Sequence, residues 1–187
     1  TMSGTPNTLL ALGSANPVET ISQMVSDQES VMITPEEQAR LDKAAKIDAY
    51  FAKYDLPLEG YGMKFVIEAE KNGLDWQLLP AIAMAESTAC VHIIDITYNC
   101  FGWGGGKIKF DSFDHGIEVV AWNLGGNNPN TARHYAGKTT SQIIDMYNPP
   151  YIRHDYNSII RSVMTKIDTM PVPVKAFATE TATPVEA

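Results

Sequence analysis

The chain has 187 residues, of which 44% are hydrophobic, and a formal net charge of −8 at pH 7. This length and apolar content suffice for one globular domain with a hydrophobic core, and the acidic balance without a basic face argues against nucleic acid as a partner. No apolar run approaches the roughly 18 residues of a membrane-spanning helix, so we expect no transmembrane segment in this chain. The first residues show no basic region followed by an apolar one, so we expect that a signal peptide or anchor is either absent or has been removed.

Composition divides the chain into three parts. Residues 1–33 are rich in Ser, Thr, Asn and Gly with little periodicity, and residues 171–187 form a tail rich in Pro, Thr and Ala. Neither part carries the apolar pattern that would offset its loss of conformational entropy, so we expect a flexible N-terminal segment and a disordered C-terminal tail. Residues 34–170 remain as a single folded domain, which we expect to be monomeric.

Hydrophobic periodicity and capping signals predict about six helices in this domain. Thr34 and Pro35 open the first with a capping-box pattern, and we expect Asp75 and Ser112 to cap two others. Tyr156 is predicted on the apolar face of the last helix. The predicted helices cover about 35–54, 61–71, 76–87, 113–124, 140–147 and 155–169. Residues 90–110, with β-branched residues and glycines, predict a small irregular or hairpin-containing lobe, so the fold class is mainly α.

One carboxylate, Glu86, stands at the end of an apolar helix. Leu79 and Ile82 lie two turns and one turn before it on the same helix face, so we expect Glu86 to be partly buried at the floor of a cleft. Apolar surroundings disfavour the charged form of a carboxyl group, which lets it serve as a general acid near neutral pH. The alternative is a helix-end glutamate turned to solvent.

A loop rich in aromatic residues and glycine follows, and its composition is that of a carbohydrate-binding platform. Its sequence is Tyr98-Asn99-Cys100-Phe101-Gly102-Trp103-Gly104-Gly105-Gly106. Together with the apolar helix and the Glu86-Ser87 pair, the loop resembles the active-site region of lysozyme-like enzymes that cut bacterial cell-wall glycan. It is most similar to the glucosaminidases, which carry an Asn-x-Phe-Gly segment here, and next to the lytic transglycosylases. The Gly-Leu-Met-Gln segment that transglycosylases carry after their Glu-Ser pair is absent.

The resemblance implies a lysozyme-like domain with Glu86 as the general acid. The activity it implies is a glycoside hydrolase of the N-acetylglucosaminidase, muramidase or lytic transglycosylase type. Such an enzyme cuts a β-1,4 bond between N-acetylated amino sugars of peptidoglycan or a related glycan. It also implies a site tyrosine that hydrogen-bonds near the scissile bond, at Tyr135 or Tyr147.

Glycoside cleavage also needs a group that meets the positive charge on the sugar ring. Asp95 is the candidate for a second carboxylate by its position in the loop, with Asp111 and Asp114 behind it. A solvated loop aspartate is the simpler interpretation of each. A route assisted by the substrate's acetamido group, or a transglycosylase route, requires no second carboxylate.

Several residues around the loop are candidate substrate contacts. Aromatic side chains stack on the apolar faces of sugar rings, and neighbouring polar groups can hold the substrate. The candidates are Ser87, Tyr98, Asn99, Phe101, Trp103, Tyr135 and Tyr147. Core packing is the alternative for Phe101 and Tyr135, and a bond back to a helix carbonyl is the alternative for Ser87.

The chain has two cysteines, Cys90 and Cys100, which flank this loop region. We predict that they form a disulfide, because an even count leaves no orphan thiol, although two buried thiols are the alternative. A disulfide implies an oxidising compartment, hence an extracellular or cell-envelope protein, phage-associated proteins included. A cysteine nucleophile is disfavoured, because the sequence around Cys90 and Cys100 lacks the histidine context of such sites, although His92 lies close to Cys90. The histidines show no metal-ligand spacing, so we expect neither a metal nor a cofactor.

Two functions stay open at this point. The first is the peptidoglycan-cleaving glycosidase. The second is a non-catalytic glycan-binding or envelope scaffold protein that retains the lysozyme-like fold, in which Glu86 is a relic. Loss of turbidity, or release of reducing ends, from purified cell walls separates the two.

Overall fold

The computed structural model describes residues 33–93 and 97–172, which form seven helices and no strand. A mainly α domain is therefore confirmed. All six predicted helices are present: α2 (Pro35–Ala52), α3 (Gly62–Lys71), α4 (Leu78–Ser87), α5 (Phe113–Leu124), α7 (Thr140–Tyr147) and α8 (Tyr156–Asp168). One short helix, α6 (Ala132–Tyr135), was not predicted. Asp95 and nearly all of the two predicted tails lie outside the described residues.

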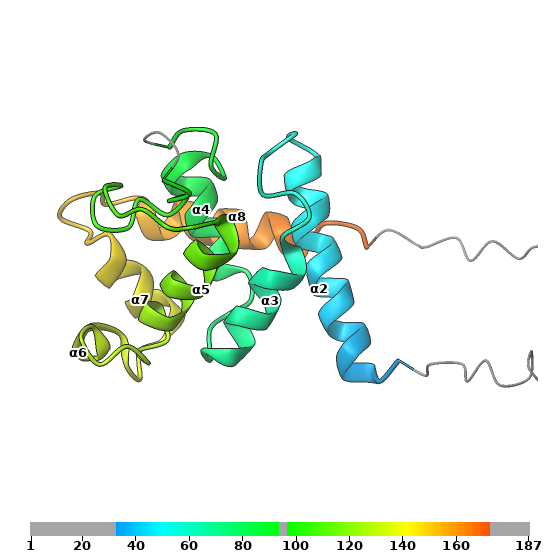
Figure 1. Cartoon of the computed structure of the whole chain (residues 1–187), viewed down its shortest axis with the longest axis horizontal. Helices are drawn as coiled ribbons and strands as arrows, with labels where there is room; N and C mark the ends of the chain where they lie inside the picture. The colour runs from blue at the N-terminus through cyan, green and yellow to red at the C-terminus, as the bar shows by residue number, and fades with distance from the viewer. Residues whose placement is uncertain (1–32, 94–96, 173–187) are drawn as a thin grey trace, which may run out of the picture. The chain divides into compact units, whose positions relative to one another are not determined.

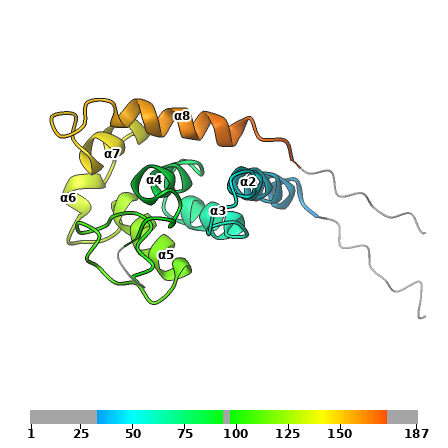
Figure 2. The same cartoon turned by 90° about the horizontal axis from the view of Figure 1, so that it is seen from above.

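The helices belong to one compact unit that begins at Pro35. Helix α2 packs on α3 at one end of this unit, and α6 and α7 lie at the other end (Figure 1). Helix α8 runs along one side and contacts α7, α4 and α2 (Figure 2). This arrangement brings the last helix of the chain against the helix that carries Glu86.

Helix α4 lies at the centre of the unit, in contact with α3, α5 and α8. Every residue from Leu78 to Ala83 is buried, as expected for a helix that is apolar on all sides. Only one side of the last turn is open: Met84 and Ala85 are half-buried and Glu86 is exposed, whereas Ser87 is buried. The core itself therefore fixes the position of the backbone from which Glu86 projects.

Two capping predictions have different outcomes. The Ser112 hydroxyl accepts a hydrogen bond from the backbone N–H of His115 at 3.1 Å, which confirms Ser112 as the cap of α5. The prediction for Asp75 is wrong: α4 begins later, at Leu78, after Gln77 as its N-cap. The Asp75 carboxylate instead accepts from the backbone N–H of Gln77 at 3.2 Å, so it closes the turn that precedes the helix.

The segment between α4 and α5 is irregular, and its described residues contain no strand. A backbone hydrogen bond from Phe110 to the carbonyl of Thr97, at 2.9 Å, joins its two sides. Of the two predicted forms, the described part of this lobe therefore takes the irregular one.

None of the helices in residues 33–93 and 97–172 is long and apolar enough to cross a membrane.

Candidate active site

Helix α4 ends in a turn whose backbone is held in an unusual conformation. Thr88, Ala89 and Cys90 have positive φ angles of 53°, 49° and 77°. Each such residue costs roughly 1 kcal/mol or more, so the turn persists only because its surroundings hold it. The Ser87 hydroxyl accepts from the backbone N–H of Cys90 at 2.8 Å and donates to the carbonyl of Cys100 at 2.7 Å. Buried Ser87 thus holds the turn together.

Cys90 and Cys100 form a disulfide, which confirms the predicted pair. Their Cα atoms lie 4.5 Å apart, and both residues are buried. The disulfide joins the turn after α4 to the glycine-rich loop, residues 98–106. Together with Ser87, it holds this loop beside the end of the helix that carries Glu86.

We expect neither Cys90 nor Cys100 to react with an alkylating reagent in the native, unreduced protein, and both to react after reduction and unfolding. Replacing both cysteines by serine should lower the free energy of unfolding by about 2 to 3 kcal/mol, because the unfolded chain regains the entropy of a ring of about ten residues. Mass spectrometry of the labelled protein and urea denaturation measure the two effects. Full labelling of both thiols without reductant would show that the disulfide is absent.

Asn99 organises the glycine-rich loop through three hydrogen bonds. Its Nδ2 donates to the carbonyls of Trp103 and Ile108, both at 2.9 Å, and its Oδ1 accepts from the backbone N–H of Trp103 at 2.9 Å. The Asn99 side chain is buried, and Phe101 is fully buried in the core. Asn99 and Phe101 were predicted to contact the substrate. Like Ser87, they instead hold the loop in place, and none of the three lines the pocket beside Glu86.

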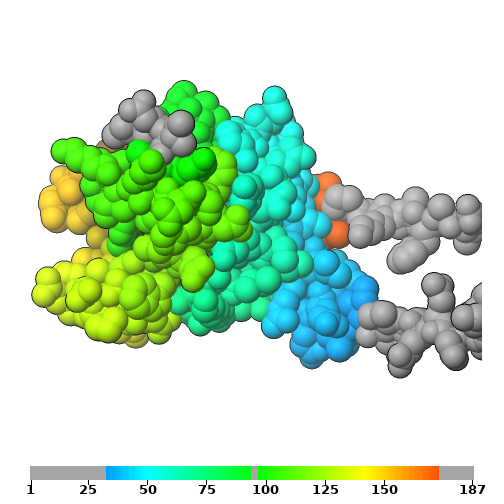
Figure 3. Space-filling view, in the orientation of Figure 1, coloured from blue at the N-terminus to red at the C-terminus, as the bar shows by residue number. Residues whose placement is uncertain are grey.

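A pocket of about 450 Å³ lies beside the C-terminal end of α4. The glycine-rich loop supplies part of its lining, and α4, α6 and the C-terminal end of α7 supply the rest. In the space-filling view these parts of the chain lie together at the end of the unit opposite α2 (Figure 3). The lining residues are Glu86, Gly102, Trp103, Gly104, Gly105, Tyr135, Tyr147 and Asn148. Glu86 is the one charged side chain among them.

Three of the predicted aromatic residues meet in this pocket, and we call Trp103, Tyr135 and Tyr147 the aromatic wall. The Trp103 ring centroid lies 6.4 Å from that of Tyr135 and 5.8 Å from that of Tyr147. Burial raises the pKa of both tyrosines, and for Tyr147 the nearby Glu86 carboxylate adds to the effect. The wall is therefore neutral over the ordinary pH range. Tyr98 does not line the pocket, because its ring packs edge-on against Phe113 at 5.2 Å.

The prediction that Glu86 is partly buried is wrong, since the residue is exposed. The residues one and two turns before it, Ile82 and Leu79, are fully buried, but one turn later this side of α4 is open at Glu86, while Ser87 stays buried. The two carboxylate oxygens have different neighbours. Oε1 accepts a hydrogen bond from the Tyr156 hydroxyl at 2.6 Å, and Oε2 lies against Gly102, 2.8 Å from where a Cβ atom of that residue would stand.

The sequence analysis missed two residues of the site, Asn148 in the pocket lining and Tyr156 beside Glu86. The place of Tyr156 on the apolar face of a helix indicated core packing alone. Tyr156 is fully buried, and its ring stacks on that of Tyr147 with centroids 6.3 Å apart and planes inclined by 8°. The chemistry of the side chain could have revealed this role. A buried tyrosine hydroxyl needs a hydrogen-bond partner, whereas a phenylalanine in its place needs none. In this fold the partner is Glu86.

The structure brings none of the described aspartates to the pocket. Asp111 and Asp114 lie at the start of α5, where both are exposed, and Asp111 pairs with His115 at 3.0 Å. Neither lines the pocket. Asp95, the first candidate for a second carboxylate, lies outside the described residues.

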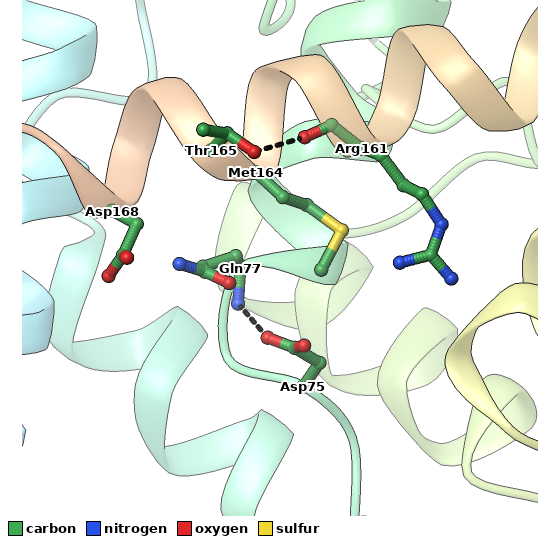
Figure 4. Close-up of a pocket in the computed structure, with 6 residues that line it drawn as sticks. All are labelled: Asp75, Gln77, Arg161, Met164, Thr165 and Asp168. Carbon is green, nitrogen blue, oxygen red and sulfur yellow. Dashed lines mark hydrogen bonds between the residues drawn. The ribbon is translucent and has the colours of Figure 1, made fainter.

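A second pocket, of about 310 Å³, lies between the start of α4 and helix α8 (Figure 4). It is lined by Asp75, Gln77, Arg161, Met164, Thr165 and Asp168. Its polar groups serve the local structure: Arg161 donates to the Asn157 side chain at 3.0 Å, and Thr165 to the carbonyl of Arg161 at 3.0 Å. This pocket lies at the opposite end of α4 from Glu86.

No family model, curated protein or solved structure matches this chain. Within residues 33–93 and 97–172, no three His, Cys, Asp or Glu side chains gather in a group that could hold a metal ion.

Proposed function

We propose that the protein is a glycosidase that cleaves peptidoglycan at a β-1,4 bond between N-acetylated amino sugars, with Glu86 as the general acid. One observation carries the proposal: a single carboxyl group lines a pocket that is otherwise formed by aromatic rings, an amide side chain and glycines. Aromatic rings with polar ends suit the apolar faces and hydroxyl groups of sugars. Protonation of the glycosidic oxygen requires one carboxylic acid.

In the proposed reaction, Glu86 gives its proton to the glycosidic oxygen while the bond to the anomeric carbon breaks. The aromatic wall holds the sugar rings, and the glycines at 102, 104 and 105 let the substrate approach the backbone closely. No second carboxylate from the described residues lines the pocket. The cation that develops on the ring is stabilised by the acetamido group of the substrate or by Asp95, and water then adds to the anomeric carbon and returns a proton to Glu86. In the transglycosylase route, a hydroxyl group of the substrate adds to the anomeric carbon instead and gives its proton to Glu86, which yields an anhydro sugar.

Two further observations support this proposal. The motifs around Glu86 resemble those of glucosaminidases and, next, of lytic transglycosylases. The disulfide between Cys90 and Cys100 is typical of proteins from oxidising compartments. We therefore propose that the protein acts outside the cytoplasm as a monomer, at the cell envelope, in the extracellular space or as part of a phage particle.

One observation favours the alternative, a non-catalytic glycan-binding or envelope scaffold protein. Glu86 is exposed, whereas a carboxyl group that acts as a general acid is typically sheltered from water. In that case the aromatic wall would bind glycan, and Glu86 would contribute only a hydrogen bond.

Digestion of purified peptidoglycan followed by mass spectrometry tests the two functions. We expect the wild-type protein to release soluble fragments, whose ends identify the linkage cut: a new reducing sugar for hydrolysis, or an anhydro sugar for transglycosylation. Tight binding to peptidoglycan without release of fragments would support the alternative and contradict the glycosidase. Absence of both would contradict both functions.

A further inference from the structure

An exposed glutamate at a helix end needs a tether if it is to act as an acid. The side chain of Glu86 has three rotatable bonds and is exposed to solvent, so packing alone does not select one of its conformers. In this site Glu86 is tethered by a short hydrogen bond, 2.6 Å long, from the Tyr156 hydroxyl to Oε1. The position of the carboxyl group therefore depends on that of Tyr156.

Tyr156 is itself held rigidly. It begins α8 and is fully buried, with the Tyr147 ring stacked parallel to its own and the Arg153 guanidinium 5.9 Å from its ring centroid. Burial raises the pKa of Tyr156, and the hydrogen bond to Glu86 raises it further. The hydroxyl thus keeps its proton at any ordinary pH and acts as a permanent donor.

The stacked pair of Tyr147 and Tyr156 also positions the loop backbone that faces the second oxygen of Glu86. The Tyr147 hydroxyl donates to the carbonyl of Phe101, the residue before Gly102. Gly102 is in turn the residue against which the second oxygen of Glu86, Oε2, lies. The stacked tyrosines therefore fix the position of the Glu86 carboxyl group, through Oε1, and the position of the loop backbone that faces Oε2.

We infer that Tyr156 is a positioning residue, whose hydroxyl occupies Oε1 of Glu86 and leaves Oε2 to meet the glycosidic oxygen. This inference rests on the proposed function, since it assigns a role in glycoside cleavage. It adds a residue from α8, 70 positions away from Glu86 in the sequence, to the machinery of the site.

Tyr156→Phe tests the inference, because it removes the hydroxyl and keeps the ring that stacks on Tyr147. With soluble peptidoglycan fragments as substrate, we expect kcat to fall at least about tenfold, because one charge-assisted hydrogen bond that orients the acid is lost, while KM changes less than about twofold. Tyr50→Phe is the matched control: Tyr50 is another buried tyrosine, in α2, and does not line the pocket. Circular dichroism checks that both variants are folded.

A second measurement does not depend on catalysis. In protein labelled with ¹³C at glutamate carboxyl groups, the Glu86 signal is assigned by its loss in Glu86→Gln. We expect this signal to shift in Tyr156→Phe and to stay in place in Tyr50→Phe.

The outcomes separate the inference from the proposed function. Wild-type kcat in Tyr156→Phe, a rise in KM alone or an unmoved Glu86 signal would each overturn the positioning role, while the glycosidase would stand on the wild-type cleavage. A wild-type protein that releases no fragments would overturn the proposed function and, with it, the positioning role of Tyr156 in cleavage. In that case a shifted Glu86 signal would still identify the hydrogen bond as structural.

Discussion

Replacing Glu86 by glutamine should abolish cleavage of peptidoglycan and leave the fold intact. The amide keeps the size of the side chain and still accepts a hydrogen bond from Tyr156, but it cannot protonate a leaving oxygen. A general acid contributes about 10² to 10⁴ to a rate, so we expect kcat to fall at least about a hundredfold. Because Glu86 is exposed, the free energy of unfolding should change by less than about 0.5 kcal/mol.

Release of soluble fragments from peptidoglycan measures the first effect, and urea denaturation measures the second. Glu59→Gln provides the control, because Glu59 is also an exposed carboxylate but lies in the turn between α2 and α3. This control should cleave at the wild-type rate. If Glu86→Gln kept more than about a tenth of the wild-type rate, less than about 1.4 kcal/mol of transition-state stabilisation would be lost, and Glu86 would not be the acid.

Replacing Gly102 by alanine should inactivate the site by displacing the acid. A Cβ atom at this position would stand 2.8 Å from Oε2 of Glu86, which is too close for a contact between carbon and oxygen. The carboxyl group must move away, and a displacement of about 1 Å can cost a hundredfold in rate. The φ angle of Gly102 is also +62°, where alanine destabilises the fold by roughly 1 kcal/mol.

Gly73→Ala separates the two effects of that substitution. The φ angle of Gly73 is +65°, and no atom lies within 4 Å of the position of its Cβ, so alanine there suffers the backbone strain without a collision. We expect both variants to lose a similar free energy of unfolding, measured by urea denaturation. Only Gly102→Ala should lose cleavage activity. Equal activities for the two variants would show that Gly102 does not set the position of Glu86.

Local signals in the sequence determined six of the seven helices of the described residues, the disulfide and the place of the candidate acid. Helix boundaries follow from hydrophobic period and from short-range chemistry, such as the Ser112 cap, which acts within one turn. Cys90 and Cys100 are the only cysteines and are close in the chain, so their pairing needed no tertiary information. Glu86 stood out because a charged residue interrupts an apolar helix.

The tertiary structure alone decided how these residues work together. A helical period shows which face of α4 points inward, but not where the neighbouring elements stop covering that face, so it could not show that Glu86 is exposed. The burial of Phe101 and Asn99 behind the pocket, and the meeting of Trp103 with Tyr147, depend on how the loop packs against α7. Contacts of this kind leave no period in a sequence.

The pairing of Glu86 with Tyr156 shows the same limit most clearly. The two residues are 70 positions apart, and they meet because α8 packs along α4. In the sequence, Tyr156 is one more aromatic residue on an apolar helix face, and its hydroxyl acquires a role only where the packing of two helices gives it a carboxylate to bind. Local pattern therefore determined all but one of the helices in the described residues and singled out Glu86, and helix packing decided which neighbours hold its side chain in place.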